Sequence, residues 1–306
     1  MDTFCYDIID ELEYLSGERV DKALSILVDS LSRSYIQKII KEDVVQVNDK
    51  PVKASYRLSS EDTIRFELPE HSEPDILPEN IPLSILYEDD DVLVINKPKS
   101  MVVHPAPGHY SHTLVNAVLY HCGDSLSGIN GVMRPGIVHR IDMDTTGSLV
   151  ICKNDSAHRA LAQQLKDHSI TRKYLAICHG VLKEDKGTIC TNIGRDNRDR
   201  KRMAVVPDTQ GKPAITHYHV LQRFNKYTYI ECELETGRTH QIRVHMAHLG
   251  HPLLGDPLYC PIKSPYSLIG QTLHAYTLGF LHPSSGQYME FQAPLPDYFK
   301  RLLEVL

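Results

Sequence analysis

Two helical patterns and several short strand patterns occupy the first 68 residues. Apolar residues recur three or four positions apart in both helical segments, and Ser32 is placed to cap the second helix. Residues 44–54 favour a strand, a turn at Asn48 and Asp49, and a second strand, while residues 63–66 favour a third. The apolar positions that define the helices are Val20, Leu24, Leu27 and Leu31, then Ile36, Ile39 and Ile40. We expect two helices packed on a small sheet, a unit of about 60 residues, which is near the lower limit for independent folding.

A proline-rich stretch separates this unit from the rest of the chain. Prolines at positions 69, 74, 78 and 82 exclude a continuous helix or a central strand there. We therefore predict a linker at about 69–82. It would join a small domain at residues 1–75, which includes an acidic N-terminal extension, to a larger domain at residues 81–306.

Strand patterns outnumber helical patterns in the larger domain. Apolar runs and period-two alternation predict strands within residues 90–98, 148–155, 173–182 and 227–236. Helical periodicity appears only across Thr113–His121 and His158–His168. Because helices and strands do not alternate regularly, we predict an α+β domain with a mixed, largely antiparallel sheet.

Composition places the chain among ordinary globular proteins. Of its 306 residues, 42% are hydrophobic and 24% are charged, which excludes a disordered or fibrous chain. The seven cysteines form no CxxC pair, and the N-terminus has neither a basic region nor an apolar run typical of a secretory signal. No apolar run approaches the roughly 20 residues that a membrane helix needs. We expect a cytoplasmic protein with reduced thiols.

The net charge of −6 argues mildly against a nucleic-acid-binding protein, but the charge is unevenly distributed. Residues 1–80 carry 9 basic and 18 acidic residues, a net of −9. The remaining residues carry 33 − 9 = 24 basic and 39 − 18 = 21 acidic residues, a net of +3. An acidic total therefore does not exclude RNA, and we expect RNA affinity to depend mainly on the larger domain.

The small domain resembles the αL RNA-binding module found in a small-subunit ribosomal protein and in bacterial tyrosyl-tRNA synthetases. The similarity lies in Arg-Val-Asp at 19–21, Ser-Arg-Ser at 32–34 and Val-Gln-Val-Asn at 45–48, although Asp49 replaces the usual turn glycine. The resemblance implies that Arg33, Gln37 and Lys38 on the second helix face RNA phosphates. For each residue alone, a solvated helix face is an equally good explanation.

Residues 134–155 form the densest candidate site. His139, Arg140, Asp142 and Asp144 lie between two predicted strands, with Gly147 permitting a tight turn. A carboxylate among cations suits a nucleophile or a base. Spacing alone nevertheless favours a connecting loop held by hydrogen bonds between Asp side chains and the backbone.

Two further segments carry clustered chemistry. Residues 235–259 contain Arg238 and Arg243 beside four histidines, at 240, 245, 248 and 251. A metal site there is disfavoured because acidic ligands are few, no HExxH pattern occurs and arginines are poor neighbours for a cation. Residues 195–202 hold five basic and two acidic residues, including Arg195, Arg198 and Arg202. Such a run is usually a solvated loop, but it suits phosphate contacts if the substrate is RNA.

Taken together, these segments resemble the RluA/RluD-type pseudouridine synthases. HRIDMDTTG, RKYLA and ETGRTHQIRVH occur in the family's order, and the similarity covers residues 81–306 almost continuously. Such enzymes isomerise uridine to pseudouridine within RNA. The resemblance implies that Asp142 is the catalytic carboxylate, that Tyr174 stacks on the uracil and that Arg238 pairs with the aspartate. It also implies that Arg140 enters the RNA stack in place of the flipped nucleotide, with His139 beside it contacting RNA.

The resemblance further implies the partners of the enzyme. We expect large-subunit ribosomal RNA as substrate, no metal or other cofactor, no membrane partner and a monomeric protein. Alternatives are a synthase acting on tRNA or on both RNA types, or a non-catalytic RNA-binding or ribosome-assembly factor on the same fold. A metal-dependent hydrolase built on His240–His251 is a third alternative.

Overall fold

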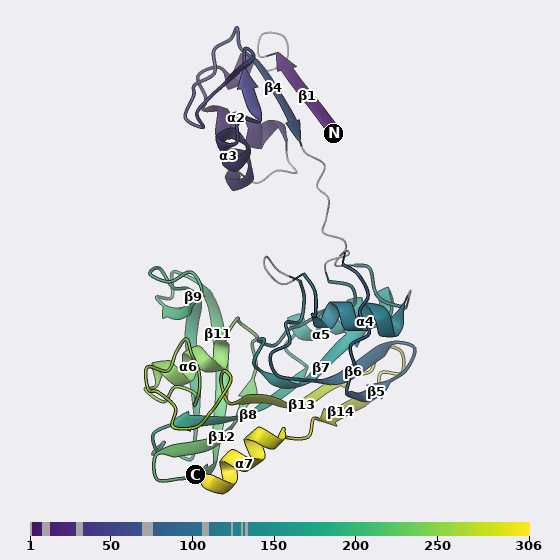
Figure 1. The fold of residues 1–306 in the computed structure, drawn as a ribbon, viewed down its shortest axis with the longest axis vertical. Coiled ribbons are helices and arrows are strands. Elements are labelled where there is room, and N and C mark those ends of the chain that lie inside the picture. The colour runs from purple at the N-terminus through teal and green to yellow at the C-terminus, as the bar shows by residue number, and fades with distance from the viewer. Residues whose placement is uncertain are drawn as a thin grey trace. The chain divides into compact units, whose positions relative to one another are not determined.

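The computed structural model describes residues 2–7, 13–28, 33–68, 76–105, 110–123, 125–129, 131 and 134–306. The chain divides into two compact units, Met1–Glu73 and Pro74–Leu306 (Figure 1). Ser32, the expected helix cap, and residues 69–75 of the expected linker lie outside the described residues. Each unit is described separately.

Unit 1 contains two helices and a four-stranded sheet. The predicted helices are present as α2 (Val20–Leu27) and α3 (Arg33–Lys41), after a 3-10 turn, η1 (Glu13–Leu15). The strands lie in the order β1-β4-β2-β3. Their bounds are β1 (Asp2–Asp7), β2 (Val45–Val47), β3 (Lys50–Pro51) and β4 (Thr63–Leu68). The apolar positions that predicted the helices, among them Val20, Leu24, Ile36 and Ile39, pack with Ile64 and Phe66 in one core.

The turn between β2 and β3 forms without a glycine. Asn48 and Asp49 have φ values of 52° and 59°. A two-residue hairpin with both central residues at positive φ matches the right-handed twist of the strands, and Asn and Asp tolerate this conformation better than other non-glycine residues. The predicted turn is confirmed, and Asp49 serves where the related modules have glycine.

Unit 2 is built on one long sheet in the order β10-β9-β11-β12-β8-β13-β7-β6-β5, with β14 paired to β13. Every pairing is antiparallel except that of β13 with β7. The predicted α+β fold with a largely antiparallel sheet is therefore confirmed. The strand bounds are β5 (Ile85–Glu88), β6 (Val92–Lys97), β7 (Thr146–Cys152), β8 (Thr171–His179), β9 (Lys186–Arg195), β10 (Met203–Val206), β11 (Lys212–Arg223), β12 (Tyr227–Leu234), β13 (Leu273–Leu281) and β14 (Tyr288–Gln292).

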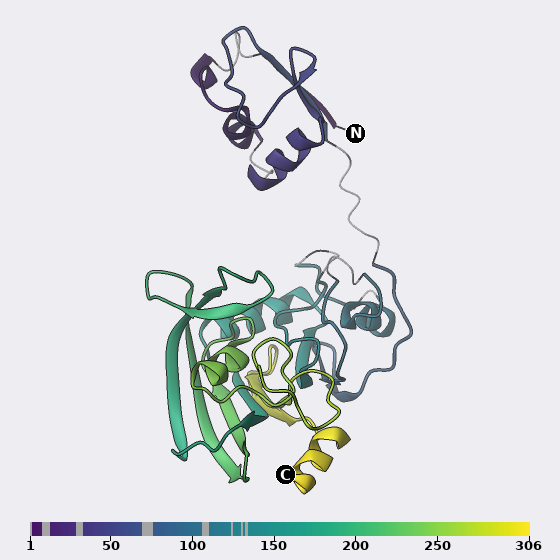
Figure 2. The same ribbon diagram turned by 60° about the vertical axis from the view of Figure 1, so that its left-hand side comes forward.

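The helices of unit 2 lie at different parts of this sheet (Figures 1 and 2). Helices α4 (Leu114–Cys122) and α5 (Asp155–Lys166) were predicted, and each begins at a side-chain cap, Thr113 and Asn154 respectively. Helix α6 (Gln241–His248) contacts β10 and β11, and α7 (Asp297–Val305) ends the chain. No helix among the described residues is long and apolar enough to cross a membrane.

One close approach in the sheet requires glycine. Gly147, at the start of β7, has a φ of 112° and lies against the backbone of Ala275 in β13, where a Cβ atom would overlap the carbonyl of that residue. Since β7 and β13 form the one parallel pair of the sheet, Gly147 lets the segment before β7 enter directly beside β13. This places residues 140–145, which lead into β7, beside the start of β13.

Candidate active site

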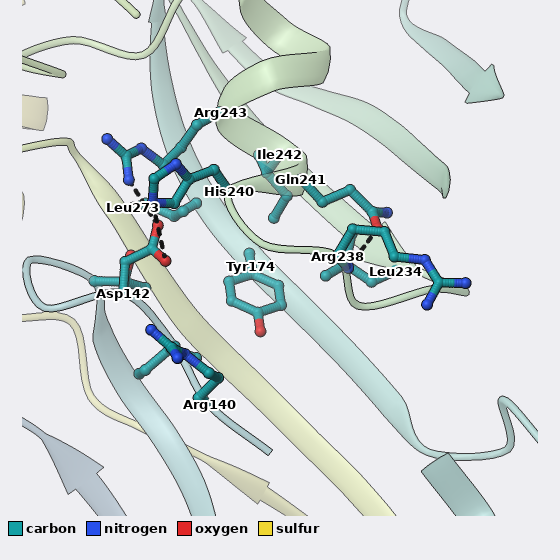
Figure 3. A pocket seen from close by; sticks show the side chains of 12 residues that line it. Arg140, Asp142, Tyr174, Leu234, Arg238, His240, Gln241, Ile242, Arg243 and Leu273 are labelled. Atoms are coloured by element: carbon teal, nitrogen blue, oxygen red, sulfur yellow. Dashed lines mark hydrogen bonds and ion pairs between the residues drawn. The ribbon is translucent and has the colours of Figure 1, made fainter. Parts of the chain in front are cut away.

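A hollow open to solvent, with a cavity volume of about 50 Å³, brings together residues from five parts of unit 2. Arg140, Asp142 and Thr145 come from the segment before β7, Tyr174 from β8, Leu234 from the end of β12 and Leu273 from the start of β13. The turn into α6 and its first residues complete the wall (Figure 3). Four of the residues predicted as site residues, Arg140, Asp142, Tyr174 and Arg238, therefore share one hollow.

The Asp142 carboxylate is held by Arg243. Nη1 of Arg243 donates to Oδ2 of Asp142 over 2.8 Å, while Nε and Nη2 bind both oxygens of Asp256 at 2.7 and 2.9 Å. The Arg243 side chain is only 5% exposed and the Asp256 side chain is fully buried. Burial alone would lower the pKa of Arg243, but the hydrogen bonds to Asp256 and the charge of Asp142 outweigh it and raise this pKa. The guanidinium is thus a fixed cation.

The expectation that Arg238 pairs with Asp142 is wrong. Nε of Arg238 donates to the carbonyl of Pro213 over 2.8 Å, and in Figure 3 its guanidinium points away from Asp142. The reason is local. Gln241 Oε1 accepts the backbone N–H of Arg238, so Arg238 lies in the turn that leads into α6, whereas Arg243 lies on the helix itself. From the sequence, Arg243 was noted only as a neighbour of the histidines, and no helix was predicted for the segment that forms α6.

His240 also faces Asp142. It adopts a left-handed conformation at φ 57° just before α6, and its Nε2 lies 3.8 Å from Oδ1 of Asp142. The ring lines the hollow, while Nδ1 lies 2.8 Å from the Tyr259 hydroxyl. Burial, partly opposed by the charge of Asp142, lowers the pKa of His240 and favours the neutral imidazole.

Two further rings of the histidine cluster, those of His245 and His251, bind protein groups. His245 is fully buried, with Nδ1 2.9 Å from the Thr216 hydroxyl and Nε2 3.1 Å from the Thr191 hydroxyl. His251 Nδ1 lies 2.8 Å from the carbonyl oxygen of His179. Within the part of the chain that the structure describes, no three His, Cys, Asp or Glu residues are grouped to hold a metal ion.

Tyr174 lies at the centre of the hollow, between Asp142 and Arg238 (Figure 3). Its side chain is 9% exposed, and burial raises the pKa of its phenol, an effect that Arg172 opposes. The hydroxyl therefore keeps its proton at neutral pH. A flat apolar ring at this position suits contact with a planar ligand.

Arg140 and His139 point to different surroundings although they are adjacent. Arg140 is exposed, lines the hollow and donates from Nη1 to Nε2 of the buried His104 over 3.1 Å. His139 Nε2 instead accepts the backbone N–H of Val150 in β7 over 3.1 Å, and burial lowers the pKa of His139 to about 3. The structure thus gives His139 a role inside the fold in place of the RNA contact expected from its position.

A buried lysine lies behind the Asp142 segment. Lys97 is fully buried, and its Nζ donates to the carbonyls of Pro98, Met101 and Met143 at 2.8 to 2.9 Å. The ammonium therefore fixes the residue next to Asp142 to the end of β6. Burial lowers the pKa of Lys97 to about 7, although Asp144 and Asp142 oppose the shift. Lys97 was not predicted as a site residue, because a lysine after an apolar strand is normally exposed.

Comparison with known proteins identifies the family. The RNA pseudouridylate synthase family matches residues 91–248, just over half of the chain. A Bacillus subtilis protein named "Uncharacterized RNA pseudouridine synthase YlyB" is 53% identical over 294 residues, 96% of each chain. The chain belongs to the RNA pseudouridine synthases. "Ribosomal large subunit pseudouridine synthase D" of Zymomonas mobilis is 44% identical over 96% of this chain and 95% of its own.

A solved structure agrees with this family. "Human RNA Pseudouridylate Synthase Domain Containing 1" has a TM-score of 0.59 and 27% identity, and covers 71% of this chain and 85% of its own. The S4 domain family matches residues 18–64, so the synthase carries an S4 RNA-binding domain in unit 1.

Within the S4 domain, the cations expected to face RNA also bind acidic side chains. Asp21 is fully buried, and its Oδ2 accepts from Nη2 of Arg33 at 3.2 Å and from Gln37 at 2.7 Å. Burial would raise the pKa of Asp21, but the hydrogen bonds from Arg19, Gln37 and Arg33 outweigh it and lower this pKa. Nζ of Lys38, which is exposed, lies 3.8 Å from a Glu42 oxygen. Arg33 and Gln37 therefore stabilise the S4 fold around Asp21.

The basic run of the synthase joins β9 to β10. Nη1 of Arg195 donates to the carbonyl of Arg200 over 2.8 Å, while Arg198 is exposed. The Arg202 guanidinium lies over the Tyr259 ring, 5.2 Å from its centre. The run is thus an ordered loop seated beside α6 and the hollow.

The buried histidines predict a loss of stability in mild acid. Burial lowers the pKa of His245 to about 4, so this ring stays neutral in the folded synthase while the unfolded chain binds a proton below about pH 6.5. The stabilising contribution of the neutral His245 is therefore fully present above about pH 6.5. The free energy of unfolding should fall by about 1.4 kcal/mol per pH unit for this histidine as the pH drops toward 4.

Urea unfolding at pH 7.5, 6.5, 5.5 and 5.0 measures this loss. The variant His245→Gln should be less stable at pH 7.5 but should lose less stability than the wild type between pH 6.5 and 5.0. Equal losses in the two proteins would show that His245 does not titrate in this way.

Proposed function

We propose that this synthase converts a uridine of large-subunit ribosomal RNA to pseudouridine, with Asp142 as the catalytic carboxylate. The observation that supports the role of Asp142 is its place in the hollow, 19% exposed and held through Oδ2 by the buried Arg243. Relatives named "Ribosomal large subunit pseudouridine synthase D" in Zymomonas mobilis and Neisseria meningitidis, each 44% identical, support the RNA class.

The reaction suits a fixed carboxylate. The bond between the sugar C1′ and N1 of uracil breaks, the base turns, C5 bonds to C1′, and the proton on C5 is lost while N1 gains one. Bond cleavage builds positive charge on the sugar. Asp142 can stabilise this charge, attack C1′ as a nucleophile, or remove a proton from the neighbouring carbon. Arg243 binds Oδ2, so Oδ1 is the Asp142 oxygen that can attack C1′ or remove the neighbouring proton.

Tyr174 and Arg140 complete the proposed site. A uracil turned out of the stack can lie on the Tyr174 ring, whose protonated hydroxyl stays available as a hydrogen-bond donor. The exposed Arg140 lies at the edge of the hollow, where its planar guanidinium can fill the gap that the nucleotide leaves. Arg195, Arg198 and Arg202 then serve the surrounding RNA phosphates, together with Arg33 and Lys38 of the S4 domain.

Asp142→Asn tests the catalytic role. We expect loss of pseudouridine formation by at least about 1,000-fold, because the amide lacks the charge that opposes the developing cation. Tritium release from RNA labelled at C5 of uridine measures the reaction, and thermal unfolding shows whether the variant folds. Release at the wild-type rate would contradict the assignment. Ribosomal and transfer RNA from a deletion strain, mapped for missing pseudouridines, test the substrate class.

Arg243→Lys and Arg238→Lys form a matched pair. Lysine at 243 keeps the charge but loses the simultaneous contacts to Asp142 and Asp256, so we expect the single-turnover rate to fall by about 100-fold. Lysine at 238 should change the rate by less than about 3-fold, because Arg238 does not contact Asp142. The same loss in both variants would contradict the assignment of the aspartate's partner to Arg243.

Arg140→Ala tests the gap-filling role, with Arg134→Ala as control. Arg134 is an exposed arginine whose charge acts on Arg140, so both variants remove one cation from the same surface. We expect Arg140→Ala to slow the single-turnover rate by about 30-fold or more while RNA Kd rises by no more than about 5-fold. Arg134→Ala should change only Kd. Equal losses in rate and affinity for Arg140→Ala would exclude a role in base extrusion.

A further inference from the structure

Tyr259 connects three parts of the active-site wall. Its side chain is buried, and its backbone N–H donates to Asp256, the residue that fixes Arg243. The guanidinium of Arg243 lies over its ring, 5.1 Å from the centre. The hydroxyl lies 2.8 Å from Nδ1 of His240 and accepts the backbone N–H of Met203, which follows the basic loop, over 2.8 Å.

The protons of this arrangement can be assigned by counting donors and acceptors. Since the Met203 N–H donates to the Tyr259 oxygen, the hydroxyl proton of Tyr259 needs an acceptor. Nδ1 of His240 is the acceptor at hydrogen-bond distance among the described residues. A neutral imidazole that accepts at Nδ1 carries its own proton on Nε2. This tautomer directs an N–H toward Oδ1 of Asp142, 3.8 Å away.

The two oxygens of Asp142 thus face different donors. Arg243 binds Oδ2 at 2.8 Å, and His240 lies on the Oδ1 side. One hydrogen bond leaves a carboxylate free to turn about its Cβ–Cγ bond, whereas a donor on each oxygen fixes the plane of the group. The His240 distance exceeds an N–H···O hydrogen bond by about 0.8 Å, a gap of the kind that closes when substrate fills a site.

We propose that His240 is a positioning residue for Asp142 and that Tyr259 fixes the tautomer in which it acts. This inference rests on the proposed role of Asp142. It assigns a function to the histidine nearest the carboxylate, and it explains why an arginine-rich loop, an aromatic ring and the start of α6 meet at one hydroxyl group.

Two substitutions at position 240 separate positioning from folding. At φ 57°, asparagine is accommodated more readily than glutamine, so the backbone favours His240→Asn. The amide of asparagine reaches only as far as Nδ1, toward Tyr259, whereas that of glutamine reaches the position of Nε2, toward Asp142. Greater activity of the glutamine variant would therefore run against the backbone preference.

Single-turnover rates and RNA Kd are measured for both variants. We expect His240→Asn to lose about 10- to 50-fold in rate with Kd changed by less than about 2-fold, and His240→Gln to stay within about 3-fold of wild type. Equal rate losses in the two variants, or a loss that appears only in Kd, would overturn the proposal.

The tautomer is measured directly from the 15N chemical shifts of the His240 ring, without substrate. We expect the proton on Nε2 in the wild type and a larger fraction of the Nδ1–H tautomer in Tyr259→Phe, which keeps the ring and loses the hydroxyl that donates to Nδ1. Tyr87→Phe is the matched control, because it removes a hydrogen bond to Asp89 from β5, at the other end of the sheet, and should leave the His240 signals unchanged. A wild-type proton on Nδ1 would overturn the proposal.

The roles proposed for Asp142 and His240 can be disproved separately. If Asp142→Asn stays active, the proposed catalytic role of Asp142 is wrong. If Asp142→Asn is inactive while His240→Asn keeps the wild-type rate, the role of Asp142 stands and the positioning role of His240 is wrong.

Discussion

The buried Arg243, bound at once to Asp142 and Asp256, is the interaction on which the active site depends. Burying a guanidinium between two carboxylates stabilises a protein only if good hydrogen-bond geometry offsets the cost of removing these charges from water. Here the three N···O distances lie between 2.7 and 2.9 Å. Asp256 also accepts the backbone N–H groups of Leu258 and Tyr259, so its own loop is folded around it. The position of Asp142 is thereby tied to α6 and to the loop after it, more than 90 residues away in the sequence.

This dependence explains the polar residues that surround α6. Gln241 Nε2 donates to the carbonyl of Ile215 and to the Thr216 hydroxyl, and its Oε1 accepts from Thr236 and Arg238, so the start of the helix is anchored to β11 and β12. His245, on the same helix, contacts the hydroxyls of Thr216 and Thr191. From the opposite side, Lys97 fixes the carbonyl of Met143. Buried polar groups are costly unless satisfied, and these hold the two sides of the hollow in a single arrangement.

Local sequence patterns predicted much of this fold but not the contacts across it. The helices at α2, α3, α4 and α5 and the turn at Asn48 and Asp49 follow from periodicity and capping, which short segments contain. Strand β11 was missed because its inward positions include Thr216 and Tyr218, whose polar groups obscure the alternation. Arg238 was assigned to Asp142 through the family resemblance, whereas the fold brings Arg243 to it. Which arginine reaches Asp142 depends on the left-handed turn at His240, and such a turn becomes evident only in the folded chain.

Some cations of the chain stabilise the fold, whereas others face solvent, where a substrate can reach them. Arg243, Lys97 and Arg172 are buried. Their side chains bind carboxylates or backbone carbonyls inside the protein. A count of lysines and arginines therefore overstates the number of cations available to RNA phosphates. Exposed cations such as Arg134 and Arg198 stay accessible to phosphates. A net charge of −6 is therefore compatible with an RNA enzyme, because affinity depends on where uncompensated cations lie and not on their sum.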